Sequence, residues 1–205
     1  MNHRKIGALA TSLGLILGVA AAQAQEKKQE KKEAPGMEMP KPGPEQKKLG
    51  YFIGTWKSEG EIKENPMMPA GKMTSTDRCE WFHGGFNVVC HSTGNSPLGS
   101  SHGLGILGYN SQDKTYSYYG IDSMGFAEMS KGTVDGSTWT YGSEAKMGEK
   151  TVRSRYVMNE VSPTSYSFKY ETSEDGQNWS LVMEGKSSKV EQKAEASKTA
   201  PDEKK

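Results

Sequence analysis

The sequence has almost no excess of charge of either sign. It contains 26 lysines and arginines against 25 aspartates and glutamates, which gives a formal net charge of +1 at pH 7. A nucleic-acid-binding protein needs a basic face, and the basic residues between the two ends of the chain do not cluster into one. Nucleic acid is therefore not an expected partner.

Histidine and cysteine are scarce, with four and two residues. His83, His91 and His102 occur at none of the spacings, such as His-x-x-x-His, that are typical of zinc sites. The segment Gly99-Ser-Ser-His-Gly103 matches the Gly-x-Ser-x-Gly string of serine hydrolases. A strand-like run follows it, however, where that motif requires a helix. The sequence thus predicts no metal site, no cofactor and no enzymatic activity.

The eleven methionines leave one alternative open. Met37, Met39, Met67, Met68 and Met73 lie in loop-like segments, and thioethers are soft ligands that suit Cu(I). Neither histidine nor cysteine accompanies them, so flexible apolar filling is the favoured interpretation. Copper handling remains a less favoured hypothesis.

Long apolar runs are absent except at the N-terminus. There, a basic start precedes an uncharged stretch (Ile6–Ala22), and Ala22-Gln-Ala24 matches the small-x-small site that signal peptidase recognises. The stretch is too short to favour a membrane span. We therefore expect residues 1–24 to be a cleavable signal peptide. The mature protein would begin at Gln25 and be exported to the periplasm or beyond, with an uncleaved N-terminal anchor as the alternative.

Composition divides the remaining chain into three parts. Residues 25–44 are rich in lysine and glutamate and end in a proline-punctuated stretch, which predicts a disordered lead-in. Residues 191–205 contain no large apolar residue and predict a disordered charged tail. Residues 45–190 hold the aromatic residues and are long enough for one well-filled core. A single domain is expected there.

Gly84-Gly85 predicts a two-residue turn that closes a β-hairpin, because glycine adopts positive φ without steric cost. Counting outward from this turn pairs His83 with Phe86 and places Cys79 directly opposite Cys90. Directly paired strand residues lie within disulfide distance, and exported proteins fold in oxidising compartments. A Cys79–Cys90 disulfide is therefore expected, with two free, buried cysteines as the alternative.

Apolar and polar residues alternate along most of residues 45–190, which is the pattern of half-buried β-strands. Turn signals such as Asn110-Ser111, Asp135-Gly136 and Asp175-Gly176 separate the runs. The only helical candidate is one short turn or two at Pro44 to Phe52. About ten antiparallel strands joined by short turns must stack as two sheets or close on themselves, and closure removes exposed edges. The sequence predicts an all-β, up-and-down antiparallel barrel with a short helix before the first strand.

One segment carries a resemblance. Leu49-Gly-Tyr-Phe-Ile-Gly-Thr-Trp56 resembles the Gly-x-Trp opening of lipocalin-like (calycin) barrels. Together with Pro42–Leu49, Gly84-Gly85-Phe86, Gly108-Tyr109-Asn110 and Asp175-Gly176, it makes the chain similar to a secreted bacterial family known as domain of unknown function 1579. The resemblance implies a lipocalin-like barrel in which Trp56 plugs the closed end. It implies no established activity and no site residues.

Alternation also predicts which side chains line the interior of such a barrel. The cavity candidates are Trp81, His83, Phe86, Tyr118, Met129, Trp139, Ser154, Tyr156, Phe168 and Met183. Inward glycines and serines, such as Gly60 and Ser154, are expected to leave space among them. A barrel of this size either fills its interior or holds one small ligand.

These observations favour an exported, non-catalytic protein that binds a small apolar or amphipathic molecule. The alternative is an envelope interaction module with a side-chain-filled barrel, whose outer face or tails contact a partner protein. Haem binding through His83, copper handling and catalysis in the cavity are less favoured. For His83, the favoured interpretation is a turn residue that caps the barrel rim.

Overall fold

The computed structural model describes residues 39–66 and 68–190. The expected signal peptide (1–24), most of the lead-in (25–44) and the charged tail (191–205) lie outside the described residues, as do Met37 and Met67. The predictions of export, cleavage before Gln25 and disordered ends therefore stay predictions.

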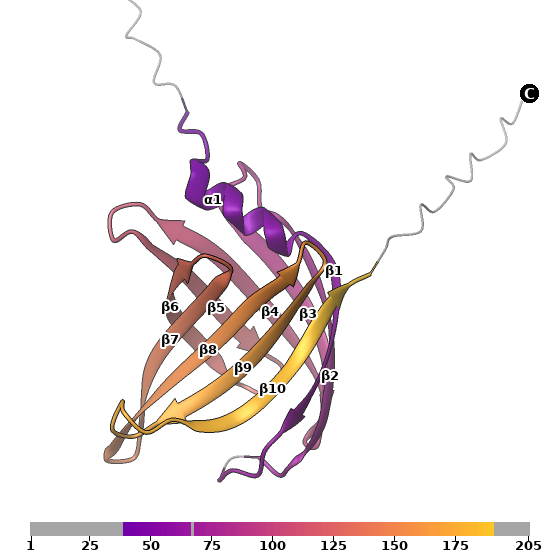
Figure 1. The fold of residues 1–205 in the computed structure, drawn as a ribbon, viewed down its shortest axis with the longest axis vertical. Coiled ribbons are helices and arrows are strands. Elements are labelled where there is room, and N and C mark those ends of the chain that lie inside the picture. The colour runs from indigo at the N-terminus through magenta and orange to yellow at the C-terminus, as the bar shows by residue number, and fades with distance from the viewer. Residues whose placement is uncertain (1–38, 67, 191–205) are drawn as a thin grey trace, which may run out of the picture. The chain divides into compact units, whose positions relative to one another are not determined.

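Ten antiparallel strands form one closed barrel in which each strand pairs with its neighbours in sequence and β1 closes against β10 (Figure 1). The strands are β1 (Gly54–Ile62), β2 (Gly71–Trp81), β3 (Val88–Ser96), β4 (Gly99–Asn110), β5 (Thr115–Asp122), β6 (Ala127–Asp135), β7 (Thr138–Met147), β8 (Lys150–Ser162), β9 (Ser165–Ser173) and β10 (Ser180–Lys189). The predicted all-β, up-and-down barrel is confirmed.

A short helical segment precedes β1, as the sequence predicts. It consists of α1 (Pro44–Lys48) and the 3₁₀ helix η1 (Leu49–Phe52). Pro44 suits the first turn of α1, where its missing N–H costs nothing, and the Gln46 Oε1 accepts a hydrogen bond from the Gly43 N–H at 3.0 Å. Figure 1 shows this segment at one end of the barrel. Leu49 and Phe52 are buried there, so the segment closes that end.

Aromatic side chains form the floor of the barrel above this segment. Trp56 and Trp139 are 2% and 1% exposed. The Trp139 ring centroid lies 5.0 Å from that of Phe52 and 4.9 Å from that of Tyr116, distances typical of favourable aromatic pairs. The Tyr116 hydroxyl also donates a hydrogen bond to the Glu45 carbonyl at 3.2 Å, which ties the helical segment to β5.

The hairpin between β2 and β3 has the predicted strand register, and the Cys79–Cys90 disulfide is confirmed. The turn itself differs from the prediction. Strand pairing stops at Trp81 and Val88, and His83 and Phe86 are not paired. The Gly85 N–H instead donates to the Phe82 carbonyl at 3.0 Å, so the tight turn spans residues 82–85, with Gly84 at φ 91°. Gly84 supplies the positive φ that such a turn requires.

We expect the disulfide to stabilise the barrel by about 2 to 3 kcal/mol, because it closes a short loop in the unfolded chain. The double variant Cys79→Ala/Cys90→Ala should lower the urea midpoint accordingly. Dithiothreitol should lower the midpoint of the parent protein and leave that of the double variant unchanged. An unchanged midpoint in the variant would show that the bridge contributes nothing to stability.

Candidate functional site

The interior of the barrel contains a cavity of about 420 Å³ above the aromatic floor. A second hollow of about 380 Å³ lies at the opposite end from η1, beside Met68, Met124 and Phe126. The two share lining residues, among them Tyr118 and Met183. They therefore form one site, with a closed floor and a mouth at the far end.

Two tyrosine rings lie flat against the wall where the strands carry glycine. A Cβ at Gly120 would meet Tyr118 Cε1 and Cζ at 2.8 and 2.9 Å, and a Cβ at Gly105 would meet Tyr118 Cε2 at 2.9 Å. Likewise, a Cβ at Gly132 would meet Tyr141 Cδ1 and Cε1 at 2.6 Å. One face of each ring therefore covers the backbone. Both residues line the cavity, although Tyr141 is only 6% exposed and lies parallel to Trp139.

Further tyrosines line the cavity and lie near serine hydroxyls. Burial raises the pKa of Tyr166, and the nearby hydroxyls of Ser187 and Ser58, which are hydrogen-bonded to each other at 3.0 Å, oppose that shift. Burial, followed by the nearby charges of Glu128 and Asp77, raises the pKa of Tyr118 to about 12. Burial likewise raises the pKa of Tyr141 and Tyr156 well above the usual value. These phenols are therefore neutral hydrogen-bonding groups at physiological pH.

Two carboxylates also face the cavity. Asp77, on β2, accepts hydrogen bonds from the Ser75 hydroxyl at 2.9 Å and from the Ser92 hydroxyl. Glu128, on β6, lies where the cavity and its mouth meet. Burial raises the pKa of Glu128, and a hydrogen bond from Ser143 at 3.5 Å opposes that shift. The polar part of the cavity is thus acidic as well as rich in hydroxyls.

Two buried side-chain oxygens in the described part of the chain have no hydrogen-bond partner: Ser130 Oγ and Tyr141 Oη. Both residues line the cavity. A buried hydroxyl without a partner costs about 1 to 3 kcal/mol, so such groups normally find one. Both oxygens have almost no accessible surface, so a bound molecule would reach them only after neighbouring side chains move.

Several predicted cavity residues lie inside the barrel. Tyr118, Tyr156, Phe168 and Met183 line the cavity. Trp139 is part of the floor beneath it. The Ser154 side chain is buried beside the wall, where its hydroxyl lies 2.7 Å from that of Ser143.

Met129 is the clearest correction, because the predicted inward direction is wrong. It is 67% exposed and pairs with Tyr119, which is itself exposed, on the outer surface. The inward side chains of β6 are Glu128 and Ser130, followed by Gly132. The prediction takes the more hydrophobic face of the strand as the inward one. In β6, however, the polar and small residues point inward, and this makes room for the rings of Tyr118 and Tyr141.

The hairpin residues Trp81, His83 and Phe86 also lie outside the set that lines the cavity. Trp81 is 39% exposed and His83 is exposed. A Cβ at Gly50 would lie 3.4 Å from Trp81 Cζ2, which places the indole against η1. The tip of the hairpin extends past the closed end of the barrel, beyond the floor. These residues therefore lie outside the cavity even though alternation along the strands assigns them to the inward face.

Other cavity residues were missed by the sequence reasoning, chiefly Asp77, Glu128, Ser130, Tyr141 and Tyr166. Asp77 shares the parity of Cys79, whose inward direction the hairpin register predicts. Extending that parity along β2 would have identified it. For β6, the alternating Glu128, Ser130 and Gly132 gave no hydrophobic signal.

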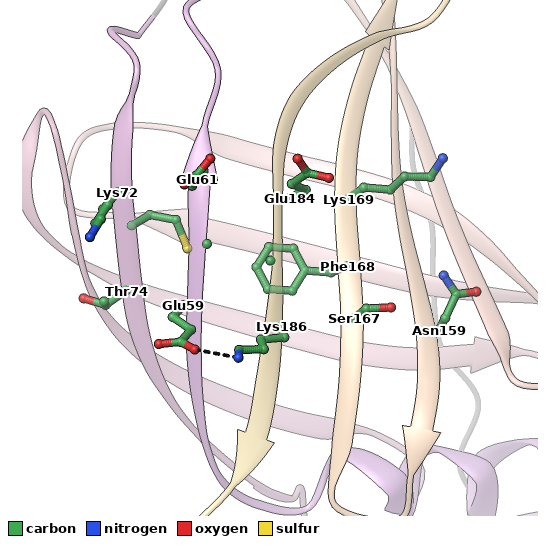
Figure 2. Close-up of a pocket in the computed structure, with 13 residues that line it drawn as sticks. Glu59, Glu61, Lys72, Thr74, Asn159, Ser167, Phe168, Lys169, Glu184 and Lys186 are labelled. Atoms are coloured by element: carbon green, nitrogen blue, oxygen red, sulfur yellow. Dashed lines mark ion pairs between the residues drawn. The ribbon is translucent and has the colours of Figure 1, made fainter.

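A larger hollow of about 650 Å³ lies at the seam between β1 and β10, beside β2 and β9. Figure 2 shows that Glu59 and Lys186 face one another across this seam, and their charged atoms lie 3.1 Å apart. Lys63 forms a similar pair with Glu184 at 3.1 Å. These exposed ion pairs are worth little in water and already satisfy each other. The hollow is thus a weaker candidate than the cavity.

In the described ranges, no helix has the length and apolar character needed to cross a membrane. Within those same residues, no group of three or more histidine, cysteine, aspartate or glutamate side chains is arranged to hold a metal ion.

Comparison with known proteins gives a family and a fold. Residues 41–189 match the model of a family described as "Protein of unknown function (DUF1579)". No curated protein matches the sequence. Among solved structures, Rv2717c from M. tuberculosis is similar over 73% of this chain and 99% of its own, with 12% identity and a TM-score of 0.51. At this identity the similarity concerns the fold alone.

Two further structures are more distantly similar. EF1p2_mFAP2b bound to DFHBI matches 71% of this chain and 98% of its own, with 12% identity and a TM-score of 0.38. The S-type phycobiliprotein lyase CPES from Guillardia theta matches 70% of this chain and 90% of its own, with 10% identity and a TM-score of 0.45.

Proposed function

The chain belongs to the DUF1579 family of proteins of unknown function, and from its own geometry we propose that it is an exported, non-catalytic protein that holds one small amphipathic molecule inside its barrel. The observation that carries this proposal is the cavity of about 420 Å³, closed at the floor and continuous with a mouth. Its volume falls within the range of about 300 to 1,000 Å³ that is usual for small-molecule sites.

The chemistry of the wall supports an amphipathic ligand. Aromatic rings and the side chains of Met73 and Met183 supply apolar surface, and hydroxyl groups lie among them. The carboxylates of Asp77 and Glu128 line the cavity and have acceptor positions left for a ligand that carries polar atoms. A purely apolar ligand would leave these positions unused, which favours a molecule with an apolar body and at least one polar group.

Export is supported by the disulfide, because such bonds persist in oxidising compartments and are rare in the cytosol. It is also supported by the predicted signal peptide. A protein outside the cytosol that encloses a small molecule would protect it from water or carry it between surfaces. Both tasks need only reversible binding.

The proposal can be tested with a neutral fluorescent probe, N-phenyl-1-naphthylamine, titrated into the mature protein. We expect an increase in fluorescence that saturates at one probe per chain. Ser130→Phe should weaken probe binding at least about tenfold, because a ring at this buried position would occupy the cavity. The control is Thr133→Phe, which adds the same ring to the exposed face of the same strand. It should leave the affinity unchanged.

The outcomes separate a hollow barrel from a filled one. If the parent protein binds no probe and Ser130→Phe lowers the thermal midpoint by several degrees, the interior is already full and the proposal is wrong. If both phenylalanine variants weaken binding equally, the probe does not bind in the cavity.

A second candidate function is an interaction module, and one observation favours it. Ile106, Tyr119 and Met129 are 37%, 47% and 67% exposed. They pair across β4, β5 and β6, which makes a continuous apolar row on the outer surface. Rows of this kind often contact partners. The sequence analysis expects an interaction module to have a barrel filled with side chains. The cavity argues against such a filled interior.

A further inference from the structure

All charged side chains that line the cavity or its mouth within the described residues are acidic. Asp77 and Glu128 line the cavity, and Asp122 joins Glu128 at the mouth. Among the described residues of both linings there is no lysine, arginine or histidine. A concave site with walls of low polarity and charges of one sign focuses the electric field and concentrates ions of the opposite sign.

The carboxylates have room for a further partner. Asp77 accepts two hydrogen bonds, from Ser75 and Ser92, but an ionised carboxylate has about four acceptor positions. Glu128 receives one hydrogen bond, from Ser143. In the described part of the chain, neither carboxylate forms a salt bridge, whereas Glu171, which is buried outside the cavity, pairs with both Arg155 and Lys169. Asp77 in the cavity and the exposed Glu128 at its rim are therefore left without a cation of the protein's own among the described residues.

The aromatic wall also favours a positive charge. Tyr118 lies flat on Gly105 and Gly120 and lines the cavity, and the face of an aromatic ring is its negative side. Such a face attracts a cation, most strongly where water is excluded. Burial raises the pKa of the Tyr118 phenol to about 12, still further above physiological pH, so no phenolate forms there.

We propose that the ligand bound inside the barrel is an organic cation, an inference that rests on the proposed function. Its apolar body packs among the aromatic rings above the floor, and its ammonium group lies between Asp77 and Glu128. Ammonium-bearing amphiphiles are thus the ligand class, and carboxylate-bearing amphiphiles such as fatty acids are rejected by the same two side chains. This distinguishes the site from a non-selective apolar pocket.

The test compares molecules with chains of about the same length and head groups of different charge. Decyltrimethylammonium and decanoate, below their micelle concentrations, and decanol, below its solubility limit, are titrated at pH 7.5 against bound N-phenyl-1-naphthylamine. We expect the ammonium compound to displace the probe at a concentration at least about tenfold lower than decanoate, with decanol between them. Equal displacement by all three would overturn the inference while leaving a binding cavity intact.

Variants that remove one negative charge show which carboxylate causes the preference for ammonium over carboxylate compounds. Asp77→Asn and Glu128→Gln should each reduce the ratio of ammonium to carboxylate affinity at least about threefold, and the double variant should reduce it further. Glu80→Gln is the matched control, since Glu80 lies on β2 with Asp77 but is exposed on the opposite face. It should leave the ratio unchanged. A ratio unaffected by Glu128→Gln and Asp77→Asn would contradict the placement of the ammonium group.

The measurements also distinguish the failure of this inference from that of the proposed function. If neither the probe nor any decyl compound binds, the cavity is not a binding site and both are wrong. If the probe binds but head-group charge has no effect, only the cation assignment is wrong. Should Asp77→Asn fail to fold, as judged by circular dichroism, the parent comparison and Glu128→Gln decide the question, because Glu128 lies at the rim.

Discussion

Replacing Gly185 by alanine is expected to lower the free energy of unfolding by about 3 kcal/mol, an unusually large effect for the addition of one methyl group. Gly185 of β10 pairs with Gly60 of β1, where the two strands approach closely. A Cβ at Gly185 would overlap the Glu59 carbonyl oxygen and lie 2.8 Å from the Gly60 Cα. Both contacts are with backbone atoms, so the strands themselves would have to separate.

The interior side of this seam is equally crowded. The same Cβ would lie 2.6 Å from Cζ of Phe168, whose ring stacks against Tyr156 with centroids 5.7 Å apart. Figure 2 shows the Phe168 ring beside the seam. Because the pairing of β1 with β10 closes the barrel, a loss of fit at this point weakens the closure rather than one local contact.

Gly142→Ala is the matched control for this prediction. A Cβ at Gly142, in β7, would approach only the Ser154 carbonyl oxygen, at 3.6 Å, which is an ordinary contact. Its effect on stability should be within about 0.5 kcal/mol of zero or slightly favourable. Urea unfolding monitored by tryptophan fluorescence measures both variants. Equal midpoints for Gly185→Ala and Gly142→Ala would show that the seam has room for a side chain.

The sequence reveals the architecture of this protein better than its interior. Period-two alternation and short turn signals suffice to predict an up-and-down barrel, because each strand pairs with its neighbour in the chain. The hairpin register predicts the disulfide because Cys79 and Cys90 are only a short count from the turn. Such local features depend on backbone geometry and are encoded by a few adjacent residues.

The interior depends on matches between distant residues, which alternation does not describe. Gly60 was expected to leave space for a ligand, yet it allows the close approach of β10 instead. Met129 was expected inside, yet β6 turns Glu128 and Ser130 inward beneath the tyrosine rings of other strands. The hydrophobicity pattern of one strand carries no information about the neighbouring strand. It therefore does not indicate that a face of small, polar residues packs against a large side chain on that neighbour.

The acidic character of the cavity was missed for the same reason. Asp77 and Glu128 read as surface residues when charge alone is considered, since isolated charges are rarely buried. Their inward direction becomes visible only when the strand register is fixed from neighbouring residues, such as Cys79 for Asp77. Polar residues inside a barrel therefore carry more information about the ligand than the aromatic residues that the pattern identifies easily.

Replacing Trp56 by alanine is expected to cost about 3 to 5 kcal/mol of stability, the usual range for removing a buried aromatic side chain. The Trp56 ring is 2% exposed and lies between Tyr51 and Tyr166, with centroid distances of 5.5 and 5.0 Å. Its indole N–H donates to the Phe52 carbonyl at 2.8 Å, and the Lys189 ammonium lies 4.8 Å from the ring centroid. One side chain thus joins η1, β1, β9 and β10.

Trp179→Ala is the matched control, because it removes the same side chain from a half-buried position outside the floor. Trp179 stacks with the Arg155 guanidinium at 4.1 Å, and its loss should cost about 1 kcal/mol or less. Urea unfolding followed by far-ultraviolet circular dichroism compares the two. Because Trp56 also lines the cavity, its removal should weaken N-phenyl-1-naphthylamine binding even where the chain remains folded, whereas Trp179→Ala should not. Equal stability losses in the two variants would show that Trp56 does not hold the closed end together.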